Sequence, residues 1–147
     1  MAAAPADVSV ECIGDVPAMV DLAWTDNCDG TGTVTGSDGP LTDPCNGTIT
    51  RTWTYTDACG NTATATQTIT VLDDVLPIIT CPADLTAVCA ISEQPAYTTY
   101  AEFTAAGGSA TDNCDIDPDS FTLLSETSTP GECPKDYTRT YQIADLC

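Results

Sequence analysis

The sequence has 147 residues, with 22 acidic residues against three basic ones, nine cysteines and no histidine. The net charge of −19 repels phosphate backbones and anionic lipid surfaces, so we expect neither nucleic-acid binding nor direct membrane insertion. Without histidine, the chain cannot form a Ser/His/Asp or Cys/His catalytic site, and we expect a protein that is not an enzyme.

The cysteines indicate an oxidising compartment. None of them forms a C-x-x-C pair, and the commonest nitrogen ligand of zinc is absent, so disulfides are favoured over a metal site. We therefore expect an extracellular or periplasmic protein. The first residues lack the basic and apolar regions of a signal peptide, so we expect secretion to be encoded outside this sequence.

Strands are predicted along the first half of the chain. Residues 7–11 form one, and Val20, Leu22 and Trp24 alternate as the inward face of another. Residues 49–57 and 62–71 alternate threonine with apolar residues, which is typical of strands with one buried and one solvated face. We interpret the threonine rows as solvent faces of an antiparallel sandwich, although such a row also suits ice or a glycan.

One short helix is predicted in the second half. Thr99 and Glu102 form a capping box, Phe103 follows, and Gly107 with Gly108 ends the helix. Because this segment fills most of an insertion relative to the first half, it leaves the all-β class unchanged.

The chain repeats itself in three places. APADVSVEC at 4–12 corresponds to CPADLTAVC at 81–89, and TDNCD occurs at 25–29 and again at 111–115. CNGTITRTWTYTDAC at 45–59 corresponds to CPKDYTRTYQIADLC at 133–147. This period predicts two tandem modules, residues 1–74 and 75–147, of which the second lacks the strand that follows Cys59 in the first. Arg51 and Arg139 are equivalent, and we expect each to pair with a carboxylate.

Cys81 has no counterpart in the first module, where Ala4 takes its place. The missing strand of the second module is expected to carry its partner, at the position that corresponds to Ala65. Within this chain we expect Cys81 to be unpaired.

Together, CPAD, DNC and DACGN resemble hyalin-type (HYR) repeats, and more closely the cysteine-rich repeats of giant gliding-motility adhesins of Bacteroidetes. The resemblance covers nearly the whole chain. It implies tandem immunoglobulin-like antiparallel β-sandwich modules, export to the bacterial cell surface by the type IX route, and a role as an adhesin or its stalk. It also implies a disulfide from the CPAD cysteine to one in the last strand of a module.

Sandwich topology suggests how the other cysteines pair. If residues 7–11 form the first strand, Cys12 and Cys45 lie at one end of the module, and Cys28 and Cys59 lie at the other. Pairing of sequential neighbours remains the alternative. The predicted bonds are Cys12–Cys45, Cys28–Cys59, Cys89–Cys133 and Cys114–Cys147.

Calcium is the one cofactor that the sequence suggests. Loops rich in side-chain oxygens recur in both modules, and calcium prefers six to eight oxygen ligands. The alternative is that these residues form turns by bonding their own backbone. In the first module the residues are Asp26, Asn27, Asp29 and Asp57. The candidate ligands at the joint are Asp73, Asp74, Asp112, Asn113, Asp115 and Asp145.

We therefore expect a structural and adhesive repeat module of a long secreted cell-surface protein, acting in gliding or surface attachment. Its expected partners are neighbouring repeats of the same chain and surface glycans or other cell-surface proteins. One alternative is a glycan- or ice-binding module, which requires an exposed aromatic or a flat threonine row. Another is an accessory domain of a secreted enzyme, which requires a catalytic domain elsewhere in the gene.

Overall fold

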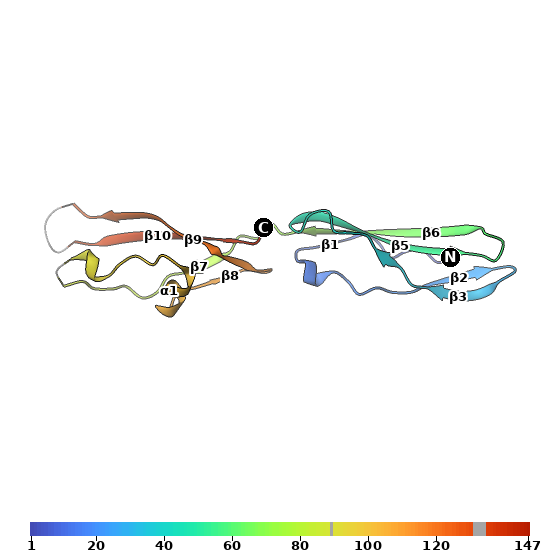
Figure 1. The fold of residues 1–147 in the computed structure, drawn as a ribbon, viewed down its shortest axis with the longest axis horizontal. Helices are drawn as coiled ribbons and strands as arrows, with labels where there is room; N and C mark the ends of the chain where they lie inside the picture. Colours follow the sequence, from blue (N-terminus) through green and yellow to red (C-terminus); the bar gives the residue numbers. More distant parts are fainter. Residues whose placement is uncertain (89, 131–134) are drawn as a thin grey trace. The chain divides into compact units, whose positions relative to one another are not determined.

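The computed structural model describes residues 1–88, 90–130 and 135–147 (Figure 1). Within these residues the protein is 46% strand and 8% helix, in several small sheets, with two disulfides and one short helix in its second half. The predicted all-β class is therefore confirmed. The chain folds as two compact units, Met1–Asp74 and Val75–Cys147, which are described in turn. No helix in the described ranges is long and apolar enough to cross a membrane.

The first unit is built around one long hairpin. β5 (Asn46–Thr56) and β6 (Thr62–Leu72) pair antiparallel along their whole lengths. β1 (Val8–Val10) joins β6 in parallel and β4 (Ser37–Asp38) joins β5, so the sheet order is β1-β6-β5-β4. β2 (Leu22–Asp26) and β3 (Gly30–Val34) form a second, shorter hairpin. A single 3-10 turn, Ile13–Asp15, follows β1.

Alternation along the long hairpin separates core from solvent as predicted. Trp53 of β5 and Ile69 and Val71 of β6 are fully buried, whereas most threonines between the inward residues are exposed. The threonines face one another across the two strands in five pairs. These pairs are Thr48–Thr70, Thr50–Thr68, Thr52–Thr66, Thr54–Thr64 and Thr56–Thr62.

The prediction for Val20 was wrong. Leu22 is buried and Trp24 is half-buried, but the Val20 side chain is 48% exposed. Val20 precedes β2, and its contribution to the core is its carbonyl, which accepts a hydrogen bond from the Trp53 indole nitrogen at 2.8 Å. The backbone, not the side chain, therefore faces inward at this position.

The second unit contains two small sheets and one helix. β7 (Ile78–Thr80) pairs with β8 (Ser109–Thr111), and β9 (Ile116–Ser128) pairs with β10 (Tyr137–Asp145). A 3-10 turn, Ile91–Glu93, lies between β7 and α1 (Tyr100–Ala105). The core packs Phe103 of α1 against Phe121 and Ile143, with Tyr97, Tyr100 and Tyr141 around them.

The helix begins and ends as predicted. The Thr99 hydroxyl accepts a hydrogen bond from the Glu102 amide, and the Glu102 carboxylate accepts one from the Thr98 amide at 2.7 Å. This second bond reaches one residue earlier than a capping box requires. Gly107, at φ 99°, ends the helix in the left-handed region that favours glycine.

Candidate functional site

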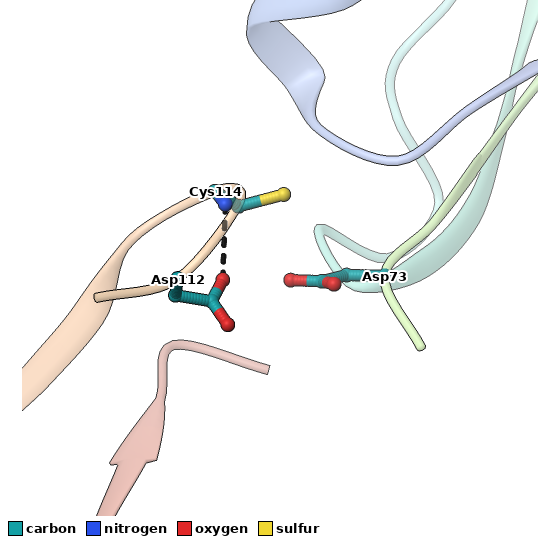
Figure 2. Close-up of side chains that lie close together, drawn as sticks. All are labelled: Asp73, Asp112 and Cys114. Carbon is teal, nitrogen blue, oxygen red and sulfur yellow. Dashed lines mark hydrogen bonds between the residues drawn. The ribbon is translucent and has the colours of Figure 1, made fainter. Parts of the chain in front are cut away.

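Five of the seven described cysteines are held by the same local turn. In each, the carboxylate of an aspartate two residues earlier accepts a hydrogen bond from the cysteine amide. Figure 2 shows this bond between Asp112 and Cys114. The aspartates are Asp26, Asp43, Asp57, Asp112 and Asp145, and the N–O distances lie between 2.7 and 2.9 Å.

These are Asx turns, in which a side-chain oxygen replaces a backbone acceptor. Their sequence signal is the spacing Asp-x-Cys, which is distinct from the loop-wide acidic pattern considered for calcium. Three turns accept further donors. Asp26 bonds the amide of Asp29, Asp43 bonds the amide of Asn46, and Asp57 bonds both the amide and the side chain of Asn61. Because each donor favours the charged carboxylate, these hydrogen bonds lower the pKa values of Asp43 and Asp57.

In each unit, two cysteine turns lie side by side at one end. In the first unit Asp29 connects them, because its carboxylate accepts hydrogen bonds from the Tyr55 hydroxyl at 2.9 Å and the Ala58 amide at 2.8 Å. In the second unit the equivalent residue, Asp115, accepts from the Leu146 amide through its backbone carbonyl. The turn of Cys28 is thus connected to that of Cys59, and the turn of Cys114 to that of Cys147.

Tyr55 lies within this acidic end of the first unit. Its ring stacks on Trp24 with centroids 3.9 Å apart, and both side chains are half-buried. Loss of water around the phenol raises the pKa of Tyr55 to about 12, with a further contribution from the hydrogen bond to Asp29 and from nearby carboxylates. The aromatic pair therefore supports the loops and is not a freely exposed platform.

The bonded cysteines occupy different positions in the two units. Cys12 and Cys45 are disulfide-bonded in the first, and Cys114 and Cys147 in the second, with two disulfides in all among the described residues. Their pairing as Cys12–Cys45 and Cys114–Cys147 stays a prediction. Cys81 is a free, exposed thiol, and Cys89 and Cys133 lie outside the described residues.

Cys28 and Cys59 depart from the expected bond, because both are free, exposed thiols. The physical reason lies in the loops that carry them. Asp29 already joins the two turns through two hydrogen bonds, so their contact does not depend on a sulfur–sulfur bond.

The candidate calcium ligands divide between the units. Asp73 and Asp74 end the first; the Asp73 amide donates to the Cys45 carbonyl, and Asp74 is exposed. Asp112, Asn113, Asp115 and Asp145 lie in the connected turns of the second. There, one carboxylate oxygen of Asp112 and one of Asp145 accept cysteine amides, and the Asn113 amide nitrogen lies 3.4 Å from the Cys114 sulfur. These contacts match the turn-forming alternative, and calcium binding stays a prediction.

Both arginines pair with a carboxylate, as predicted. Arg51 donates to both oxygens of Asp38, at 2.6 and 2.9 Å, and to the carbonyls of Pro17 and Ala18. Arg139 donates to Glu126 at 2.6 Å. Both arginines therefore have structural partners within their own unit.

Comparison with known protein families finds a match within the first unit. Residues 1–71 match the family model of the HYR-like domain with 4 cysteines, and this range contains Cys12, Cys28, Cys45 and Cys59. No curated protein and no solved structure matches the chain. The HYR-like domain is a non-catalytic module, and a disulfide-bonded example indicates an extracellular protein. The first unit is thus similar to the HYR-like domain, a kind of domain typical of extracellular adhesive repeat modules.

Proposed function

We propose that this chain is a structural and adhesive repeat segment of a long cell-surface protein, exported by the type IX route and used in gliding or surface attachment. The observation that carries the proposal is the repetition of one disulfide-bonded β unit with the same cysteine turns. A unit of about 70 residues has a small core, and cross-links compensate for it in an exposed, mechanically loaded position.

Cross-linking also limits how far each unit can be stretched. A Cys12–Cys45 bond prevents a loop of 33 residues from extending under force, which is roughly 110 Å of extended chain. Single-molecule pulling on the intact chain should show this length only after reduction, or in a Cys12→Ser/Cys45→Ser variant. Equal extensions before and after reduction would argue against a load-bearing cross-link.

The cellular test is exposure on intact cells. Antibodies against the chain should label unpermeabilised cells, and deletion of the gene should reduce attachment or gliding on glass. Labelling that appears only after permeabilisation would refute surface display. Normal attachment and gliding in the deletion strain would refute the adhesive role. The stalk role would then be tested by the pulling experiment alone.

One observation favours a second candidate function, ice or glycan binding. The five threonine pairs form two rows, on strands about 4.8 Å apart, and successive threonines lie roughly 6.8 Å apart along each strand. Replacement of Thr54 and Thr64 by lysine should interrupt this face without disturbing the core, because both are exposed. Thr138→Lys in the second unit is the matched control. If the unmodified chain neither inhibits ice recrystallisation nor binds a glycan array, this candidate is wrong.

A further inference from the structure

The threonine pairs of the first unit continue onto both neighbouring strands. On β1, Ser9 pairs with Thr70 of β6, and on β4, Ser37 pairs with Thr52 of β5. Hydroxyl groups therefore occupy one face of all four strands, and Ser9, Ser37 and seven of the ten paired threonines are exposed. The hydroxyl face, as we call it, consists of Ser9, Ser37, the ten paired threonines of β5 and β6, and the terminal pair Asn46–Leu72.

The other side of this sheet faces the core. Arg51 and Trp53 of β5 donate hydrogen bonds to the carbonyls of Pro17 and Val20, so the segment that contains these two residues lies over the inward face. Figure 1 shows β5 and β6 in one layer of the first unit and the β2–β3 hairpin in the other. Because successive side chains point to opposite faces of a strand, the threonines point away from this core. The hydroxyl face is thus an outer surface of the unit.

The hydroxyl face carries no charged side chain among its fourteen residues, although the chain has 22 acidic residues. A soluble surface usually carries charge at roughly a quarter to a third of its positions, so about four charged residues would be expected here. Asp7, which precedes β1, lies at the border, where its carboxylate accepts a hydrogen bond from the Thr68 amide at 2.7 Å. Repulsion between two copies of this acidic chain is therefore weakest at the hydroxyl face.

We propose that the hydroxyl face binds the hydroxyl face of a second copy of this chain. Its chemistry suits an identical partner, because every threonine hydroxyl can both donate and accept a hydrogen bond. Thr56 and Thr62 show this within one copy: their hydroxyl oxygens are 2.9 Å apart, and either can be the donor. Two such faces related by a two-fold axis are self-complementary. The contact itself does not depend on the adhesive role.

The paired strands have a geometry suited to stacking. β5 and β6 pair residue for residue from Asn46–Leu72 to Thr56–Thr62, whereas the pairing of β9 with β10 shifts register twice. Successive threonines on one strand lie roughly 6.8 Å apart, which leaves room between them for a threonine of the facing copy. Identical side chains on stacked sheets interdigitate in this way, with the sheets about 10 Å apart.

The size of the hydroxyl face predicts a weak and reversible contact. From the strand spacing and the residue repeat, each outward residue covers about 33 Å², so fourteen cover roughly 450 Å² on each copy. Two copies would together bury about 900 Å², which is below the range of stable interfaces and within that of transient ones. Two single chains should therefore associate only at high concentration. In a long repeat protein of the kind proposed above, many such contacts would act together.

Sedimentation equilibrium of the intact chain tests the proposal. The chain should dimerise reversibly at high concentration with a chelator present and with the exposed thiols of Cys28, Cys59 and Cys81 capped, which excludes calcium bridges and disulfides between these thiols. Raising the salt from about 0.1 M to 1 M shortens the Debye length from about 10 Å to 3 Å. Repulsion between the acidic copies then falls, so the dimer should become tighter. A contact made by ion pairs would weaken.

Thr66→Glu is the decisive variant, and Thr33→Glu is its matched control. Both threonines are exposed and both changes add one negative charge, but Thr66 lies in the hydroxyl face and Thr33 lies in β3. Because a two-fold contact contains each substitution twice, Thr66→Glu should raise the dissociation constant at least about tenfold, whereas Thr33→Glu should change it by less than about twofold. Tryptophan fluorescence checks that each variant folds, and Thr64→Glu replaces Thr66→Glu if the latter does not.

Three outcomes would overturn the proposal. The chain could remain monomeric up to its solubility limit, or Thr66→Glu and Thr33→Glu could weaken the dimer equally. In the third outcome, the chain is a monomer that binds ice or a glycan and loses this binding in Thr66→Glu, so the face serves the second candidate function. None of these outcomes bears on surface display or on the pulling experiment, so failure here is separable from failure of the proposed function.

Discussion

Replacing Arg51 by alanine should destabilise the first unit far more than Arg139→Ala destabilises the second. Arg51 is only 3% exposed, and its guanidinium has four hydrogen-bond acceptors, two of them on Asp38. Truncation removes all four bonds and leaves the carboxylate and the Pro17 and Ala18 carbonyls without this donor. Lysine cannot restore the paired geometry, because it has no planar fork of donors.

The magnitude follows from burial. Removing one partner of a buried ion pair typically costs 3–5 kcal/mol. Because the Asp38 side chain is 36% exposed, water can partly replace the lost arginine, and we expect a cost at the lower end, about 3 kcal/mol. Arg139 has one such bond, and 14% of its side chain is exposed, opposite a Glu126 side chain that is 36% exposed. Its loss should cost about 1 kcal/mol.

The same pair should make the first unit acid-sensitive. The hydrogen bond from Arg51 lowers the pKa of Asp38. A carboxylate whose folded pKa is depressed contributes stability above its unfolded pKa of about 3.9, and loses it as pH falls through the folded value. In Arg51→Ala this contribution is absent, so stability should fall less steeply below about pH 4 than in the unmodified chain.

Tryptophan fluorescence isolates this effect. The chain has two tryptophans, Trp24 and Trp53, and both lie in the first unit, so urea unfolding followed by fluorescence reports that unit alone. Arg51→Ala should lower the midpoint, and Arg139→Ala should leave it unchanged. A loss below about 1 kcal/mol at Arg51, or full rescue by Arg51→Lys, would show that the ion pair does not stabilise the unit as argued.

Three further predictions concern the turns. Gly47→Ala should destabilise the first unit by about 2 kcal/mol, because the new methyl group would clash with the Asp43 backbone. Gly14→Ala is the control: its methyl group meets open space, so it should not change the free energy of unfolding, which urea unfolding measures for both variants. Tyr55 should titrate near pH 12 by ultraviolet absorbance, and a value near 10 would contradict its loss of solvent. If the second unit binds calcium, a calcium concentration tenfold above the dissociation constant should add about 1.4 kcal/mol to its free energy of unfolding and raise its melting temperature by several degrees. A melting temperature that changes with neither calcium nor chelator would reject calcium binding.

The sequence predicted those elements whose signal is local. The long hairpin was recognisable because threonine alternates with apolar residues along both β5 and β6, and α1 because Thr99 and Glu102 flank its first turn. The 13-residue strand β9 has no such alternation, and its pairing with β10 shifts register twice, so no period-two pattern identifies it.

Non-local features were harder to predict. The parallel pairing of β1 with β6 involves only three residues of β1, and nothing within those residues selects a partner 61 positions away. At the candidate site, the acidic residues were recognised, but their roles depend on which backbone amides surround them. Asp29 illustrates this: it was considered as a calcium ligand, and its carboxylate accepts hydrogen bonds from Tyr55 and Ala58, which the sequence did not indicate.

The two units share their cysteine turns but not their cores. Trp53, Ile69 and Val71 fill the first, whereas Phe103, Phe121 and Ile143 fill the second, with Phe103 supplied by a helix that the first unit lacks. An Asx turn needs only the residues between aspartate and cysteine, so it positions the sulfur whatever the interior contains. Local turns can therefore hold these cysteines in the same way while the core changes.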